Sequence, residues 1–117
     1  MYCEICGKEP AERHHVVFKS QGGLDIEVNF IYLCPEHHRG PEGPHMCKKT
    51  DLRYKQIEQE KLFKMFGAKA TFKIKEISDI IRHDKKRLER KFVKVKNHCG
   101  EYAAVDIVRA LMGGRLY

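Results

Sequence analysis

Two features that would place a protein in or beyond a membrane are absent from this sequence of 117 residues. No apolar run approaches the roughly 20 residues that a transmembrane helix needs. No basic stretch and no apolar stretch precede Cys3, so the sequence predicts no secretory signal peptide. We therefore expect a soluble, cytoplasmic protein whose five cysteines are reduced and form no disulfide framework.

An excess of either charge is also absent from the first 67 residues, which hold 10 basic and 10 acidic side chains. Residues 68–117 hold 13 basic and 6 acidic side chains, so this part carries the whole net charge of +7. Such a cationic surface favours a polyanionic partner, because binding releases counterions from the phosphates. The alternative is an ordinary solvated surface.

The sequence has no internal repeat or low-complexity segment, and its length allows at most two small modules. The first module is too short to bury a large apolar core, and a bound metal would supply the missing stability. Cys3 and Cys6 have the spacing of one half of a tetrahedral zinc site, and Cys34 and His37 repeat that spacing. We therefore predict a structural Zn²⁺ held by these four residues.

A second group of histidines, His14, His15 and His38, is left over from this zinc site. Such a group fits a hydrolytic metal centre, which needs ligands for a cation and a free imidazole that takes a proton from water. Two further residues have open assignments. His45 is a ligand at either site or a loop residue, and Cys47 is a weaker candidate ligand.

Apolar runs and helix breakers divide the chain into short elements. Residues 15–18 and 30–33 are predicted strands joined by a glycine-containing loop. Pro35 suits the first turn of a short helix, since a proline there loses no hydrogen bond. The other expected elements are a long helix from residue 50 or 51 to 66, helices at 72–81, 84–90 and 102–112, and a strand at 92–95.

Five elements of the first 45 residues occur in a recognisable order: Cys3-x-x-Cys6-Gly7, His14-His15-Val16-Val17, Ser20-x-Gly22-Gly23, Asn29 and Leu33-Cys34-x-x-His37-His38. Their order and spacing resemble the zinc-containing branch of the HNH endonucleases. Most members have cysteine at the position of His37, and histidine is also a zinc ligand. The resemblance implies a ββα-metal (His-Me) finger that hydrolyses phosphodiester bonds.

The resemblance also implies a role for each residue of the histidine group. His15 would be the general base, because an imidazole is partly neutral at physiological pH. His14 and His38 would hold one catalytic divalent cation, Mg²⁺, Mn²⁺, Ni²⁺ or Zn²⁺, and imidazole ligands favour the last three. Asn29 would tie together the loop between the strands and keep the His15 ring oriented.

The last 45 residues resemble the small winged helix-turn-helix modules of excisionase-like regulators, with His83 where the turn usually has glycine. The basic helix at 84–90 would be the recognition helix and the strand at 92–95 the wing. The alternative is an unrelated three-helix cap used for dimerisation. On the first interpretation seven cations contact DNA phosphates: Lys85, Lys86, Arg87, Arg90, Lys91, Lys94 and Lys96.

The sequence therefore predicts an α+β protein with two parts. Residues 1–66 form an HNH nuclease domain with its zinc site and following helix, and residues 67–117 form a mainly helical, basic DNA-binding module. We expect a metal-dependent DNA endonuclease encoded by a phage or mobile element, and a homodimer is the simplest way for it to cut both strands. A non-catalytic zinc-dependent DNA-binding regulator would give no reason for the histidine group. A zinc adaptor that binds protein would leave the basic part unexplained.

Overall fold

A β-hairpin and a short helix form the N-terminal part of the computed structural model, which describes residues 1–117. The hairpin pairs β1 (Glu12–His15) with β2 (Phe30–Leu33) in antiparallel register. Its loop contains two 3-10 turns, η1 (Lys19–Gln21) and η2 (Glu27–Asn29). α1 (Pro35–Arg39) follows β2 and begins at the proline. The predicted second strand and first helix are confirmed.

The first strand ends at His15, so the predicted strand at residues 15–18 is wrong. The side chain of Asn29 explains the difference. Its Oδ1 accepts a hydrogen bond from the N–H of Val17 at 2.8 Å, and its Nδ2 donates to the carbonyl oxygen of Val17 at 3.0 Å. Both backbone groups of Val17 are therefore engaged by a side chain, and the strand ladder stops before them.

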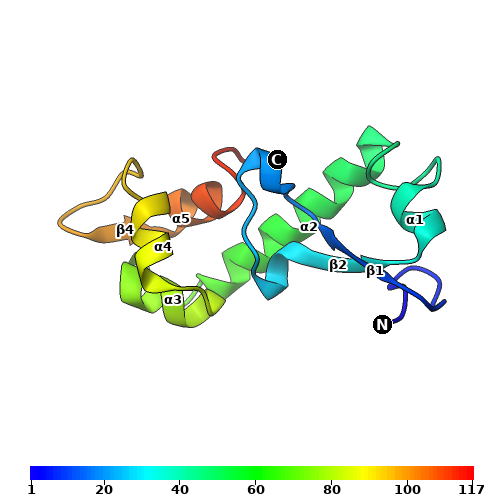
Figure 1. The fold of residues 1–117 in the computed structure, drawn as a ribbon. Coiled ribbons are helices and arrows are strands. Elements are labelled where there is room, and N and C mark those ends of the chain that lie inside the picture. Colours follow the sequence, from blue (N-terminus) through cyan, green and yellow to red (C-terminus); the bar gives the residue numbers. More distant parts are fainter.

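α2 (Lys48–Met65) is the longest helix and runs along most of the molecule (Figure 1). Its first turns lie near α1, and its last turns lie near the C-terminal helices (Figure 1). The helix begins before the predicted start at residue 50 or 51, because Cys47 already has the extended backbone of an N-cap. Near its C-terminal end, Leu62 and Phe66 are buried in the main core.

The C-terminal part pairs two short strands, and each strand leads directly into a helix. Two of the predicted helices begin later than expected, because residues 72–73 and 102–103 are extended. The two strands are antiparallel, with Phe72 opposite Tyr102. The elements in chain order are β3 (Thr71–Lys73), α3 (Ile74–Ile81), α4 (Lys85–Lys91), β4 (Glu101–Ala103) and α5 (Ala104–Leu111).

No strand forms at residues 92–95, so the predicted wing strand is wrong. Phe92 is fully buried, and its ring lies 5.2 Å from that of Tyr102, centroid to centroid. Val93, in contrast, is 73% exposed. The partner of β3 is β4 instead, and the segment after α4 turns to bring β4 into place.

The turn between α3 and α4 is built without glycine. Arg82 ends α3 in the left-handed conformation, with φ of 53°, which is unusual for a residue with a side chain. Asp84 then caps α4, since its carboxylate accepts a hydrogen bond from the N–H of Arg87 at 3.0 Å. These two residues allow a tight change of direction between the helices.

One apolar core joins the two predicted parts of the chain. Val17 and Ile26 come from the hairpin loop, and most other core residues come from α2 to α5. The protein has five α-helices and two antiparallel sheets, which confirms the predicted α+β class. None of these helices combines the length and apolar character of a membrane span.

Candidate metal centres

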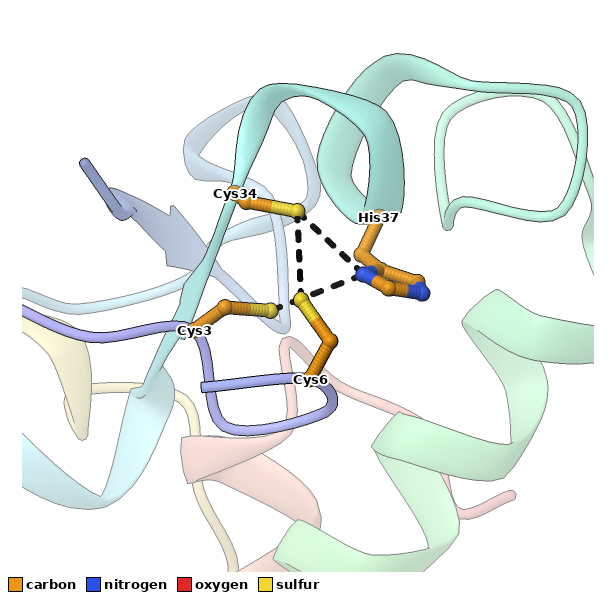
Figure 2. A group of neighbouring side chains, drawn as sticks. All are labelled: Cys3, Cys6, Cys34 and His37. Atoms are coloured by element: carbon orange, nitrogen blue, oxygen red, sulfur yellow. Dashed lines mark hydrogen bonds between the residues drawn. The ribbon is translucent and has the colours of Figure 1, made fainter. Parts of the chain in front are cut away.

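Three cysteines and one histidine converge beside the N-terminal turn (Figure 2). Cys3 and Cys6 lie on one tight turn, closed by a hydrogen bond of 2.8 Å from the N–H of Gly7 to the carbonyl oxygen of Cys3. Cys34 follows β2 as the N-cap of α1, and His37 lies within that helix. The three sulfurs and the His37 ring point toward one another (Figure 2). The structure thus brings together all four predicted zinc ligands.

The separations of these ligand atoms fit one tetrahedral zinc ion. At a tetrahedral ion, bond lengths of about 2.3 Å to sulfur and 2.0 Å to nitrogen place two sulfurs about 3.8 Å apart, and a sulfur and a nitrogen about 3.5 Å apart. The sulfurs of Cys6 and Cys34 are 3.8 Å apart. Nδ1 of His37 lies 3.6 Å from Sγ of Cys3 and 3.2 Å from Sγ of Cys34. The cluster can therefore hold a metal ion such as zinc.

The backbone around Cys3 favours the thiolate, which is the form that binds a metal. Burial alone would raise the pKa of Cys3, but backbone N–H groups of Cys34, Cys6 and Ile5, together with the Cys6 thiol, lower it to about 6. The Lys8 backbone N–H lowers the pKa of Cys6. Burial and the neighbouring Cys3 and Cys34 sulfurs raise it by more, so the net effect is a raised pKa. Cys3 is therefore more readily available than Cys6 as a charged ligand for a cation.

Three histidines form a second cluster, contributed by β1, α1 and the turn before α2. His14 Nδ1 lies 3.1 Å from His38 Nε2, and His45 Nε2 lies 2.9 Å from the same atom. When two nitrogens each lie about 2.1 Å from one ion, they are about 3.0 Å apart if the angle at the ion is 90° and about 3.4 Å apart if that angle is tetrahedral. The three rings thus have the spacing of metal ligands. The structure places His45 here, and not with the cysteines.

Glu12 fixes the orientation of His38. Its Oε1 accepts a hydrogen bond from Nδ1 of His38 at 2.8 Å, and Nε of Arg39 lies 3.4 Å from the same oxygen. The bond to His38, aided by the charge of Arg39, holds the pKa of Glu12 below its ordinary value. A metal-binding histidine usually donates its other ring N–H to a carboxylate or carbonyl group. Because Nδ1 of His38 is bonded to Glu12, Nε2 of His38 is free to face the other two rings.

The environment of His14 keeps its ring neutral. Burial, followed by the charges of His38 and His45, lowers the pKa of His14 to about 3. Burial also lowers the pKa of His45, with contributions from His38 and Arg39. A neutral imidazole offers the lone pair that a cation needs. These two rings are therefore available as ligands at neutral pH.

His15 ends β1 and lines the same open hollow as the three clustered histidines. Its Nε2 lies 2.6 Å from Oδ1 of Asp25, and Nζ of Lys19 lies 3.3 Å from the other carboxylate oxygen. The bond from His15, followed by the one from Lys19, lowers the pKa of Asp25. The hollow has a volume of about 470 Å³, and Arg13 and Arg39 add positive charge to its lining. It can admit an anionic group.

Asn29 is buried in the loop between the strands. In addition to its two bonds with Val17, its Nδ2 donates to the carbonyl oxygen of Leu24 at 2.9 Å. These bonds tie the end of β1 to the segment that carries Asp25. Asn29 makes no hydrogen bond to His15, so any effect on that ring is transmitted through the backbone and through Asp25.

The seven cations predicted to contact phosphates lie on α4 and the segment after it. Six of them are exposed. Lys91 differs, because its Nζ donates to the carbonyl oxygen of Gly22 at 2.8 Å and burial lowers its pKa. This contact ties α4 to the hairpin loop and would compete with a phosphate. The six exposed side chains are Lys85, Lys86, Arg87, Arg90, Lys94 and Lys96.

Sequence reasoning assigned no role to Glu12 or Asp25. A signal was present for Glu12, since alternate residues of a strand share a face and Glu12 is two positions before His14. No comparable signal existed for Asp25. It lies in an irregular loop, where only the folded chain determines its neighbours.

No protein-family model, curated protein or solved structure matches this chain. The fold and the side-chain clusters therefore carry the functional argument. They define an α+β protein with a cysteine and histidine cluster that can hold a metal such as zinc, and a histidine cluster beside an open cationic hollow.

Proposed function

We propose that this protein is a metal-dependent DNA endonuclease of the HNH type, encoded by a phage or mobile element. One observation carries the proposal: three histidines with the spacing of metal ligands share an open, cationic hollow with a fourth histidine that has its own carboxylate partner. Metal-dependent hydrolysis of a phosphodiester uses these three components, namely a cation, a base and a place for an anionic substrate.

His15 is the general base in this proposal. Its Nε2 is engaged by Asp25, so Nδ1 is the nitrogen that takes a proton from the attacking water. The bond to Asp25 fixes the tautomer and the ring orientation. The negative carboxylate also stabilises the imidazolium that forms when the proton is taken. Water can reach the ring because the hollow is open to solvent.

His14, His38 and His45 hold the catalytic divalent cation. When bound, the cation neutralises the charge that develops on the leaving oxygen of the phosphodiester. An all-nitrogen set favours Mn²⁺, Ni²⁺ or Zn²⁺ over Mg²⁺, which prefers oxygen ligands. Glu12 keeps the ring of His38 in place, as described above.

The cysteine and histidine cluster holds a structural zinc ion in this proposal, and the hairpin with α1 is the ββα-metal finger. The ion connects the N-terminal turn to the start of α1. Because His38 follows His37 in that helix, the zinc site also positions a ligand of the catalytic cation.

Two cationic surfaces bind the DNA backbone. Arg13, Lys19 and Arg39 line the hollow and position the scissile phosphate. The six exposed cations on and after α4 contact the flanking duplex, with α3, its turn and α4 as a helix-turn-helix-like element. Such contacts fix the position of the protein and carry little sequence information.

Nicking of a supercoiled plasmid tests the proposal. Zinc-loaded protein is incubated with plasmid and Mn²⁺, Ni²⁺, Mg²⁺ or additional Zn²⁺ in turn, and topology is followed on a gel. We expect cation-dependent nicking that His15→Ala abolishes without changing zinc content or Tm. His98→Ala removes an exposed histidine outside both clusters and should retain activity. Cation-independent nicking, or full activity of His15→Ala, would contradict the proposal.

A further inference from the structure

A second cavity lies between α2, β2 and the N-terminal turn, and its chemistry differs from that of the histidine hollow. Its volume is about 210 Å³, and most of its lining is apolar, including Phe30 and Ile31. Ile5 and Ile57 also line it, although they are 52% and 42% exposed. Exposed apolar side chains around a cavity are typical of a binding surface.

Glu58 of α2 is one of the residues that line this cavity, and its carboxyl oxygens lie buried behind the cavity surface. The residue is only 2% exposed, and neither of its oxygens has a hydrogen-bond partner. Burial raises the pKa of Glu58 to about 8, although the charges of Lys61 and Lys55 act in the opposite direction. An unpaired buried carboxyl group is costly and rare in folded proteins. Its presence points to a partner from outside the chain.

The chain itself supplies no cation to Glu58. Lys55 is committed to Asp51, with 2.6 Å between Nζ and Oδ2. Lys61 is exposed, lines the cavity and forms no ion pair. Glu4 is the other acidic residue of the lining. Once Glu58 is ionised, two carboxylates against one ammonium favour a cationic ligand here, in a protein whose overall net charge is +7.

We propose that this cavity binds the side chain of an arginine presented by a partner protein. The parallel N–H groups of a guanidinium can satisfy both unpaired oxygens of Glu58 at once, which a single ammonium cannot do as well. Apolar walls suit the methylene stem, and the aromatic ring of Tyr54 adds favourable surface for a cation. Buried arginines are frequent energetic centres of protein interfaces.

The dimensions of the cavity agree with one side chain and not with a larger ligand. Its 210 Å³ is below the range of about 300–1,000 Å³ found for drug-sized molecules. The Glu58 oxygens have almost no exposed surface, so the arginine reaches them when a covering side chain turns aside. Lys61 and Ile57 are exposed members of the lining, and exposed side chains change rotamer within nanoseconds.

Butylguanidinium is the probe, because it contains the arginine side chain and its Cα carbon without the peptide groups, and butylurea is its neutral isostere. Both are titrated into the full-length, zinc-loaded protein, and amide shifts of α2 are followed by NMR. We expect saturable binding of butylguanidinium that strengthens from pH 7 to pH 9 as Glu58 ionises. Glu58→Gln should weaken it about tenfold or more, since a charged hydrogen-bonded pair is lost. Equal binding of butylurea, or undiminished binding by Glu58→Gln, would overturn the proposal.

Three controls complete the experiment. Glu60→Gln removes an exposed carboxylate of the same helix and should bind butylguanidinium normally. Lys61→Ala removes the neighbouring cation and should strengthen binding, so weaker binding would count against the site. Sedimentation of the wild type and of Glu58→Gln should give the same mass. A dimer that Glu58→Gln dissociates would make a second copy of this chain the occupant and would overturn the assignment to a different protein.

Discussion

The imidazole of His15 and the carboxylate of Asp25 are joined by a contact of 2.6 Å between Nε2 and Oδ1, although ten positions separate them in the chain. The loop that brings them together is held by the buried side chain of Asn29. Asp25 is itself exposed and also pairs with Lys19. The ring of His15 is therefore oriented by a short chain of polar contacts at the rim of the hollow.

Asp25→Asn is expected to lower kcat for plasmid nicking about 10- to 100-fold, the usual cost of losing a residue that supports a functional histidine. Cation affinity should stay unchanged, because Asp25 is not placed at the cation. KM should change much less than kcat, because Asp25 reaches the substrate only through Lys19. Glu27→Gln, which removes an exposed carboxylate two positions further on, is the matched control. An altered KM with an unaltered kcat would assign Asp25 to substrate binding instead.

His45→Ala should weaken binding of Mn²⁺ or Ni²⁺ to the zinc-loaded protein, measured by isothermal titration calorimetry. The loss should exceed the roughly 10- to 100-fold typical of a residue that only supports a ligand. The reason is that His45 Nε2 lies 2.9 Å from His38 Nε2 and would be a direct ligand. His15→Ala serves as the contrast, because it should retain full cation affinity. Equal affinities for wild type and His45→Ala would remove His45 from the site.

Cys3→Ala is expected to release the structural zinc and to lower Tm, while Cys99→Ala should do neither. Cys3 is buried in the cluster, whereas Cys99 is exposed and outside it. Structural zinc contributes on the order of 10 kcal/mol of apparent binding free energy in small domains, so its loss should be evident in thermal unfolding. Zinc per chain is measured by atomic absorption. Unchanged zinc content in Cys3→Ala would show that the four residues are misassigned.

Replacement of both Lys86 and Arg90 by alanine should weaken DNA binding at low salt and reduce its salt dependence. The slope of log K against log salt should fall by about 0.9 for each phosphate contact that is lost. Point substitutions are needed here, since deletion of the C-terminal part would remove core residues such as Ile107. Lys64→Ala, at an exposed position of α2, is the control. An identical slope for the double variant would show that α4 does not touch DNA.

Glu58 should make the protein less stable as the pH rises. Because the folded-state pKa of Glu58 is raised from 4.5 to about 8, the folded state holds a proton that the unfolded state releases. The stability gained from this retained proton is fully present below pH 4.5. It declines by at most about 1.4 kcal/mol per pH unit as the pH rises and is lost by about pH 8. The free energy of unfolding, measured by chemical denaturation, should therefore fall with pH more steeply for the wild type than for Glu58→Gln across this window. Parallel curves would show that Glu58 ionises normally.

The sequence predicted those features that depend on neighbouring residues. The apolar run Phe30–Leu33 is a strand, and Pro35 begins a helix, because local pattern and proline geometry determine both. The ligand spacing also indicated which four residues gather in the cysteine and histidine cluster. Charge patterning located the basic surface, although it could not reveal that Lys91 is engaged by the hairpin loop.

The failures arise where distant residues decide the local structure. The first strand stops early because Asn29 captures the backbone of Val17. The segment at 92–95 is β-branched and aromatic, yet burial of Phe92 and the pairing of β3 with β4 override that propensity. The same limitation applies to His45 and Asp25, whose neighbours only the folded chain could show.

α1 has only five residues, and two of them in succession, His37 and His38, belong to different clusters. A single helical turn is not stable in isolation. Under the proposed function, a molecule that lacks zinc also loses the alignment of His38, whatever the supply of manganese or nickel. Loading would then have a compulsory order, zinc first, and a host cell starved of zinc would carry the nuclease in a silent form.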